Sequence, residues 1–496
     1  MTSWWYIASS LLLISVNTCT AIWPYWNFRS SSFKPPKLRI NNTGPTDPGL
    51  IFLGPRGNVQ STGQAALIYD NLGNLVYEGP GYTTSNFMVQ TLNGSDVITF
   101  WAGEIIDVGY RYGAVHILDN TYQEIYTVTL TADFLTPDNS TRSSYIDLHE
   151  SQITSNNTLL VTAYNVTQHD LTSIGGTSSG WMLDSHFYEI DIATNEIINS
   201  WSALGHEDEI PLTSSHQKLA GTTAGTRHNP YDAYHLNAIA PTNNGYLISL
   251  RHTWSAYYLS ENGSVVWQVS GEDGADFTQV GKANFSWQHD IRVWNETDQG
   301  MVLTLFNNAN GPNDSESPST GVSLAVDLLN KTVTGLRSLS DPDDRIFAVS
   351  QGSYQVLNED DGHVFMDYGA ISKIKEFDGA GTVVFAAQFG LNNLVASYRG
   401  YRFQWSAIPY WKPALTVTRT STGAMVYMSW NGATDYDAWA VYSAFSENST
   451  DNLLLLSSNR TGFETAVKVT NLTTKYIQVA ALQGSRILGF SDIIYF

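Results

Sequence analysis

The chain has 496 residues, of which 14% are charged, 12% are Phe, Trp or Tyr, and 39 are Gly. This length suffices for one large domain and a small one, and the many turns and aromatic residues favour an all-β fold. The formal net charge of −21 argues against nucleic acid or an anionic membrane surface as a partner.

Residues 1–21 are predicted to form a signal peptide. No charge occurs before Arg29, residues 7–16 include the apolar core Leu11-Leu-Leu-Ile14, and small and polar residues lead to a cleavage site near Ala21. An uncleaved anchor is the alternative, but the apolar run is short for a bilayer. Cleavage would also remove Cys19, the one cysteine, and with it any disulfide, zinc–thiolate site or cysteine nucleophile. We therefore expect a secreted protein with no membrane attachment after cleavage.

Residues 50–410 contain recurring units that end in an apolar strand, a polar turn and another apolar strand. The units are 57–80, 85–131, 145–203, 232–271, 287–340 and 347–390. This ending is a hairpin signal, and a unit of this size cannot bury its own faces. Radial closure buries them, so the pattern predicts a six-bladed β-propeller; a β-solenoid would need shorter and more regular periods. The stretches 165–186 and 205–231 are predicted to be loops at a binding mouth.

Three of these units carry a histidine at the same position. The stretches are Asp147-Leu-His-Glu-Ser151, Ala233-Tyr-His-Leu-Asn237 and Trp287-Gln-His-Asp290. An apolar residue follows each histidine four positions later, and a polar turn and an apolar strand come next. Equivalent positions in a closed array occupy equivalent places in space. We therefore expect His149, His235 and His289 to converge at one end of the axis.

Residues 414–496, beyond a boundary near Pro409-Tyr-Trp-Lys-Pro413, show short alternating strands. Their spacing around Trp430 and Trp439 predicts a small β-sandwich of the immunoglobulin or fibronectin type III kind. Because this segment holds none of the three histidines, we expect it to be accessory.

The sequence is rich in acceptor sites for N-glycosylation. They are Asn41, Asn93, Asn139, Asn156, Asn165, Asn262, Asn284, Asn295, Asn313, Asn330, Asn448, Asn459 and Asn471. This density is atypical of a cytosolic protein and predicts a secreted glycoprotein.

Arg251 stands at the end of the apolar strand that follows His235. Histidines with an arginine suit either metal binding or nucleophilic transfer of an anionic group. We favour anion transfer with no metal, because a guanidinium repels a cation and stabilises developing oxyanion charge. Phosphate-binding glycine loops and His-Glu-x-x-His are absent from the sequence, and no cofactor is expected.

Several stretches in order resemble the arylsulfotransferase family, and most closely its fungal branch. They are Asp232-Ala-Tyr-His-Leu-Asn237, Leu247-Ile-Ser-Leu-Arg251, Phe285-Ser-Trp-Gln-His-Asp290, Phe306-Asn-Asn308, Gln351-Gly-Ser-Tyr354 and Ser397-Tyr-Arg-Gly400. The resemblance covers most of residues 60–412 and implies a six-bladed propeller. Bacterial members of the family pass a sulfuryl group between phenols through a sulfohistidine, without a nucleotide sulfate donor.

The resemblance also implies roles for the four candidate catalytic residues. His289 would be the nucleophile, His235 and Arg251 would bind the sulfuryl oxygens, and His149 would match the remaining site histidine. The substrate would then be a phenolic or aromatic small molecule. The disulfide and long N-terminal dimerisation region of bacterial members have no counterpart here.

Two other functions remain open. Some fungal propellers of this type resemble pericyclases that guide a hetero-Diels–Alder coupling, which needs an aromatic pocket rather than a nucleophile. The side chains that could line such a pocket, or simply pack the blades, are Trp181, Trp254, Tyr257, Trp287 and Trp405. The third possibility is a secreted propeller that binds a ligand without catalysis.

Overall fold

A computed structural model describes residues 23–57, 65–104, 109–311, 317–358, 360, 362–470, 472 and 474–496. The predicted signal peptide and Cys19 lie outside this part. The described residues form strands and short 3₁₀ turns with no α-helix, so the all-β prediction is confirmed. No helix among them is long and apolar enough to cross a membrane.

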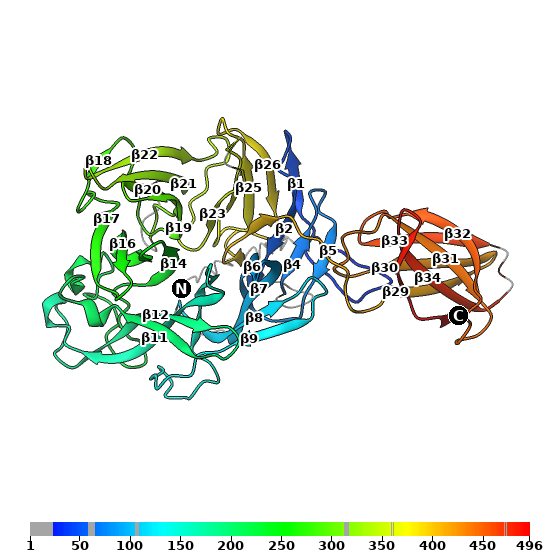
Figure 1. The fold of residues 1–496 in the computed structure, drawn as a ribbon, viewed down its shortest axis with the longest axis horizontal. Coiled ribbons are helices and arrows are strands. Elements are labelled where there is room, and N and C mark those ends of the chain that lie inside the picture. Colours follow the sequence, from blue (N-terminus) through cyan, green and yellow to red (C-terminus); the bar gives the residue numbers. More distant parts are fainter. Residues whose placement is uncertain are drawn as a thin grey trace, which may run out of the picture.

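Sheets of almost entirely antiparallel strands from residues 39–403 surround a central region, and the C-terminal strands form a second body (Figure 1). One sheet follows chain order: β14 (Leu236–Thr242), β15 (Gly245–Leu250), β16 (Ser255–Ser260) and β17 (Val265–Ser270). The turn between β16 and β17 requires Gly263, whose φ is +87° and whose missing Cβ would lie 2.9 Å from Trp201. The hairpins predicted from polar turns are therefore present.

The neighbouring sheets are built in the same way. One long sheet contains β6 (Thr84–Leu92), β7 (Ser95–Glu104), β8 (Tyr112–Leu118), β9 (Glu124–Val128), β10 (Ile146–Ile153), β11 (Thr158–His169), β12 (Gly180–Asp191) and β13 (Ile197–Ser202). Another contains β18 (Thr278–Val280), β19 (His289–Thr297), β20 (Gly300–Asn307), β21 (Thr320–Asp327) and β22 (Thr332–Leu339). The long sheet joins two predicted units through one bridge, between Ile146 and Gly113.

Strands from the two ends of this part of the chain pair with each other. One sheet combines β23 (Ser353–Val356), β24 (Val364–Asp367), β25 (Lys373–Phe377) and β26 (Val383–Gln388) with β1 (Arg39–Asn42). Another combines β2 (Leu50–Leu53), β4 (Leu67–Tyr69) and β5 (Leu75–Glu78) with β28 (Tyr401–Phe403), and β3 (Pro55–Gly57) pairs with β27 (Val395–Ser397). These pairings join the beginning of the array to its end.

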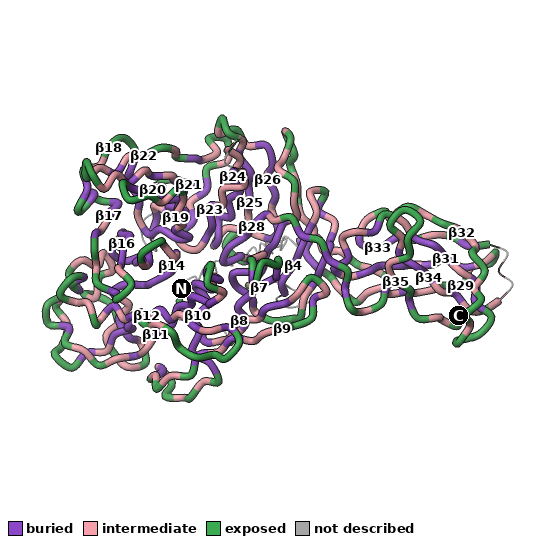
Figure 2. The backbone as a smooth tube through the Cα atoms, in the orientation of Figure 1, coloured by how far each residue is buried: buried purple, intermediate pink, exposed green. Residues whose placement is uncertain are grey.

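The innermost strands form a closed circuit around the centre. Strand β10 contacts β6 and β14, β14 contacts β19, β19 contacts β23, β23 contacts β28, and β28 contacts β6. Apolar clusters fill the space between adjacent sheets; one of them packs Leu160 and Phe187 against Ile239 and Leu250. Buried segments accordingly lie between the sheets while the turns at the edges are exposed (Figure 2). The circuit holds the ends of the inner strands close together.

The prediction of a loop over residues 165–186 was wrong for most of that stretch. Strand β11 continues to His169, strand β12 begins at Gly180, and the two pair from Thr158↔Asp191 to His169↔Gly180. Gly, Ser and Thr residues in this stretch suggested a loop, but cross-strand pairing over twelve residues overrides their weak local preferences. Residues 205–231 do form a connection without strands, with short 3₁₀ turns at Leu204–His206 and Leu212–Ser214.

The C-terminal residues form two sheets over one apolar core. The first contains β29 (Ala414–Thr420), β30 (Gly423–Ser429) and β33 (Glu464–Thr470). The second contains β31 (Ala438–Ala444), β32 (Leu453–Asn459), β34 (Tyr476–Gln483), β35 (Arg486–Phe490) and β36 (Ile494–Tyr495). Trp430 and Trp439 are buried in their shared core. That this part is a β-sandwich of the immunoglobulin or fibronectin type III kind stays a prediction.

The C-terminal part is joined to the rest of the chain by polar and aromatic contacts. The side-chain amide of Asn431 accepts from the backbone N–H of Glu78 and donates to its carbonyl oxygen, both at 2.9 Å. The Tyr122 hydroxyl donates to the carbonyl oxygen of Gly432 at 2.9 Å. The carboxyl of Glu78 is buried nearby, with 9% of the residue exposed, and its Oε2 has no hydrogen-bond partner.

Substituting Glu78 should therefore change how stability depends on pH. Burial raises the pKa of Glu78 from 4.5 to about 7. As pH rises from 4.5 to 7 the unfolded carboxyl ionises first, so this group destabilises the fold progressively. We expect Glu78→Gln to be more stable than wild type at pH 8, by up to about 3 kcal/mol, and similar to it at pH 4.5. Urea unfolding at the two pH values measures this, and an equal difference at both would contradict it.

Candidate active site

The three predicted histidines lie at the same end of the inner strands. His149 lies within β10, His235 immediately precedes β14, and His289 begins β19. The ring centroids of His149 and His235 are 4.8 Å apart. Tyr398 lies beside the group, with its ring centroid 5.4 Å from that of His149 and 6.3 Å from that of His289. The structure therefore brings the three imidazoles together, as their repeat position predicts.

Irregular backbone accompanies each histidine. The pairing register shifts within β10 between Ile146 and Ser151, in β14 after Leu236, and in β19 after His289. His235 itself has φ +56°. A bulge redirects the side chains of a strand, and non-glycine residues at positive φ are held by their surroundings at a cost of about 1–3 kcal/mol. Because of these irregularities, the three histidine side chains depart from the regular alternation between the two faces of a strand and lie together near the axis.

Hydrogen bonds hold His289 in one tautomer. Its Nδ1 lies 2.7 Å from Oδ1 of Asn308, and its Nε2 accepts the backbone N–H of Gln351 at 3.1 Å. The Asn308 amide nitrogen donates to the carbonyl oxygens of Ala348 and Gln351, so its oxygen must face the imidazole. Nδ1 therefore carries the proton and Nε2 carries the lone pair. Burial, then the charge of Arg251, lowers the pKa of His289 well below 6.5, which keeps the ring neutral.

Carboxylates hold the other two imidazoles. His149 Nδ1 is hydrogen-bonded to Asp147, and His235 Nδ1 lies 2.6 Å from Oδ2 of Asp232. Burial lowers the pKa of His149, against the opposing effect of Asp147. Burial alone would raise the pKa of Asp232, but His235 and His252 outweigh it and bring the value to about 2. Both histidines thus have an anionic partner at Nδ1, a pairing that also orients the ring.

Arg251 stands in a 3₁₀ turn, Arg251–Thr253, directly after β15. Its Nη1 lies 2.8 Å from Nε2 of His252, its Nη2 donates to the carbonyl oxygen of Val349 at 2.8 Å, and its Nε has no partner. The guanidinium carbon lies 4.9 Å from the ring centre of Trp287. Burial lowers the pKa of Arg251 to about 10, so the guanidinium is charged at neutral pH. The site thus contains a fixed, desolvated cation.

Sequence reasoning assigned no role to several residues of this site. Asp147 and Asp232 stand two and three positions before His149 and His235 in the sequence. This spacing could have indicated that each carboxylate pairs with the histidine that follows it. Tyr398 lay in a stretch noted only for its resemblance. Arg56 is distant from Tyr398 in the sequence, but its guanidinium carbon lies 5.8 Å from the centre of the Tyr398 ring. The Tyr398 hydroxyl and Nη1 of Arg56 are buried without a partner. Both offer hydrogen-bond donors for an anion.

Among the described residues, Asp232, His235 and His252 offer ligand atoms within 4.8 Å of one another, as a metal site would require. His252, however, uses both ring nitrogens: Nε2 faces Arg251, and Nδ1 lies 2.7 Å from the carbonyl oxygen of Asp232. A cation there would have to displace the guanidinium of Arg251 and overcome its charge. The donor set therefore fits an anion better than a metal.

The aromatic residues considered for a pocket fall into two groups. Trp254 and Trp287 lie at the site, in edge-to-face contact at 5.4 Å, and His216 stacks on Trp254 at 3.6 Å. Tyr257 and Trp405 are buried in apolar clusters between sheets. Trp181 packs against another such cluster, beneath the guanidinium of Arg227. Only the first two could therefore contact a substrate at the histidines.

The four predicted catalytic residues are almost wholly buried. The exposed fractions are 3% for His149, 9% for His235, 6% for Arg251 and 1% for His289. A Cβ built on Gly109 would lie 3.8 Å from Cε1 of His235, so backbone passes close over the most exposed of them. A substrate must therefore displace covering groups to reach His289.

The glycosylation sequons are mostly on the surface. Asn165 is half-buried, Asn313 and Asn471 lie outside the described residues, and the remaining sequon asparagines are exposed. Their exposure is compatible with modification, which stays a prediction.

The fold and site define an all-β protein with a buried histidine–arginine centre, and comparison with known proteins specifies its family. The model of the arylsulfotransferase (ASST) family matches residues 88–390. This match covers more than half of the chain and includes His149, His235, Arg251 and His289. The chain belongs to the arylsulfotransferase family. No match was found among curated proteins.

Solved structures resemble the chain only distantly. A protein of unknown function from Bacteroides caccae shares 12% identity with a TM-score of 0.37, covering 72% of this chain and 99% of its own. A periplasmic gluconolactonase from Pseudomonas aeruginosa shares 13% identity with a TM-score of 0.35, covering 85% and 99%. The GH43 protein BlXynB from Bacillus licheniformis, as a mutant, shares 8% identity with a TM-score of 0.35, covering 83% and 89%. Similarities this weak say nothing about activity.

Proposed function

We propose that this protein transfers a sulfuryl group from an aryl sulfate to a phenol, through a covalent intermediate on His289. The proposal places this chemistry at one mouth of a six-bladed propeller and assigns the chain to the fungal branch of the family. One observation carries it: a neutral imidazole with a fixed lone pair at Nε2 lies within the electric field of a buried guanidinium, that of Arg251. Family membership supports the reaction class.

In the first half-reaction, the Nε2 lone pair of His289 attacks sulfur and the bond between sulfur and the aryl oxygen breaks. The electrons leave on the phenolate oxygen, which takes a proton from the imidazolium form of one of the carboxylate-paired histidines, His149 or His235, and leaves that ring neutral. In the second half, that imidazole removes the proton of the acceptor phenol, whose oxygen takes the sulfuryl group from His289. Atoms and charge balance over the two halves, and no external cofactor is needed.

The surrounding donors suit the developing charge. Three sulfuryl oxygens need partners in the transition state, and the unpartnered donors at the site include Nε of Arg251, Nη1 of Arg56 and the hydroxyl of Tyr398. All three atoms are buried, and at a buried atom a hydrogen bond to charge is worth more than in water. The approaching sulfate would also replace the backbone N–H of Gln351 as the partner of His289 Nε2.

Arg251→Ala should lower kcat/KM for aryl sulfate transfer by about 10²-fold or more, the effect of losing an oxyanion donor. Arg251→Lys should recover only part of this, because an ammonium cannot reproduce the contacts with His252 and Val349 while also binding sulfate. Turnover of a chromogenic aryl sulfate with a phenol acceptor provides the measurement. The control is Arg419→Ala, in the C-terminal part, which should retain wild-type transfer. Equal rates for Arg251→Ala and wild type would contradict the assignment.

Two assays separate the proposal from the alternatives: transfer from an aryl sulfate, and acceleration of a quinone-methide cycloaddition. A pericyclase would leave aryl sulfates untouched, would accelerate a quinone-methide cycloaddition and would retain that activity in His289→Ala. A binding protein would be inert in both assays.

A further inference from the structure

A cavity lies at the opposite end of the inner strands from the histidines. Its volume is about 820 Å³. Its walls come from the later halves of the inner strands, including Gln152 of β10, Trp294 of β19 and Gln355 of β23. From His289 to Trp294 the strand rises roughly 16 Å at about 3.3 Å per residue. The cavity is therefore a separate space, within the size range of small-molecule sites.

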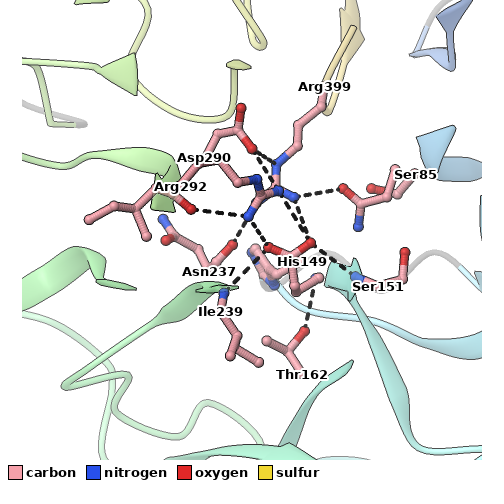
Figure 3. A network of polar contacts seen from close by, with 12 residues as sticks. Ser85, His149, Ser151, Thr162, Asn237, Ile239, Asp290, Arg292 and Arg399 are labelled. Atoms are coloured by element: carbon pink, nitrogen blue, oxygen red, sulfur yellow. Dashed lines mark hydrogen bonds and ion pairs between the residues drawn. The ribbon is translucent and has the colours of Figure 1, made fainter. Parts of the chain in front are cut away.

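A layer of buried ion pairs lies between this cavity and the histidines. Glu150 contacts Arg292 at 2.8 Å and Arg399 at 3.0 Å, and Asp290 contacts the same two arginines at 2.8 and 3.4 Å. Arg399 also donates to the carbonyl oxygen of Asn237 at 2.8 Å. Figure 3 shows these side chains converging from several strands. A ligand in the cavity therefore meets this layer, not the proposed nucleophile.

The charges that line the cavity cancel. The lining contains two acids, Asp47 and Asp290, and two arginines, Arg292 and Arg402. Arg292 is paired with Asp290 and Glu150, and Nη2 of Arg402 lies 3.0 Å from Glu376. Because each arginine already has a carboxylate partner, the cavity offers neither a strong anion site nor a strong cation site.

The remaining lining consists of amides and aromatic rings. The amide residues are Gln90, Asn93, Gln152, Asn157, Gln355 and Gln404. Oε1 of Gln152 is buried with no hydrogen-bond partner. Trp294 lines the same cavity half-buried, and its Nε1 donates to Thr304 at 3.2 Å, which fixes the indole. Amides both donate and accept, which suits hydroxyl groups, and an indole face packs against the apolar side of a ring.

We propose that this cavity binds a neutral glycan. The ligand class follows from cancelled charge, abundant amides and a fixed tryptophan in one cavity. The proposal concerns the opposite mouth and does not depend on sulfuryl transfer.

The glycan has two possible sources. One is a free oligosaccharide, and the other is a glycan on this chain, because the sequon residue Asn93 lines the cavity and Asn156 precedes the lining residue Asn157. The double variant Asn93→Gln/Asn156→Gln distinguishes them. Binding of free sugar by wild type and variant indicates a free ligand, whereas binding by the variant alone indicates that the chain's own glycan occupies the cavity.

The test is isothermal titration calorimetry of the full-length protein and of the double variant. The probes are cellobiose, maltose, N,N′-diacetylchitobiose and α-1,6-mannobiose. We expect at least one to bind, and Trp294→Ala to weaken that binding about tenfold or more, as loss of an aromatic packing face predicts. Gln404→Ala, at an exposed lining position, serves if the tryptophan variant fails to fold, and should also weaken binding.

Heat of binding needs no turnover, so this test is independent of the proposed reaction. His289→Ala should bind the sugar as wild type does, because the ion-pair layer lies between the two sites. Absence of binding by both proteins would overturn the proposal, as would unchanged affinity in a folded Trp294→Ala variant. Tighter binding of glucuronate than of methyl glucoside would overturn the assignment to a neutral ligand.

Discussion

Replacing His289 with alanine should abolish aryl sulfate transfer, with a loss of at least about 10³-fold, because the substitution removes the atom that accepts the sulfuryl group. Intact-mass analysis should show one added sulfuryl group on wild-type protein that has been incubated with donor and no acceptor. The variant should show no adduct. Burial keeps the pKa of His289 well below 6.5, so wild-type protein should still form the adduct at pH 6, where an ordinary histidine is largely protonated.

The matched control for this substitution is His169→Ala. His169 pairs with Glu207 near the surface, at 2.8 Å, and lies outside the histidine cluster. It should retain both transfer and adduct. An adduct on His289→Ala would show that another residue is the nucleophile, and His149 and His235 would then be the next to test.

The second large effect should come from Glu150, which is fully buried between Arg292 and Arg399. Those two arginines lower its pKa despite its burial, so it is ionised at neutral pH. Glu150→Ala leaves two guanidinium groups with only Asp290 as a nearby acid. We expect a loss of about 3–5 kcal/mol in the free energy of unfolding, as measured by urea denaturation, or failure to accumulate as folded protein.

The control for this prediction is Glu104→Ala, which breaks an ion pair of a different kind. The carboxylate of Glu104 is 71% exposed and contacts Arg142 at 2.7 Å. Exposed pairs contribute about 0–1 kcal/mol, so this variant should remain close to wild type. An equal loss of unfolding free energy in Glu150→Ala and Glu104→Ala would contradict the prediction that the buried ion pairs contribute more to stability than an exposed one.

The sequence was sufficient to predict the all-β class and the grouping of the catalytic candidates. Equivalent repeat positions placed His149, His235 and His289 together, because the pattern of strand and turn fixes which end of each inner strand a residue occupies. Arg251 was found from its position after the strand that pairs with that of His235. A sequence repeat therefore predicts which residues lie together in space, because equivalent repeat positions occupy equivalent places in the fold.

Contacts across the ring could not be predicted. Arg399 reaches Asn86 and Glu150, far away in sequence, and no local pattern links them. The bulges beside the histidines were not predicted either, because they arise from tertiary contacts and no glycine or proline marks them in the sequence. The adjoining ends of strands β11 and β12, residues 165–169 and 180–186, were missed for a similar reason: their polar residues have weak β preference individually, and pairing decides their conformation.

The pairing of β2 with β28 has a consequence for biosynthesis. Leu50 pairs with Phe403, so this contact closes a loop of more than three hundred residues. The ring cannot close until almost all of it has emerged from the ribosome, because β28 comes late in the chain. Throughout that interval β2 and its neighbours present unpaired backbone, the kind of edge that recruits strands from other chains. Folding of this protein should therefore be slow and dependent on protection during synthesis, however stable the closed ring becomes.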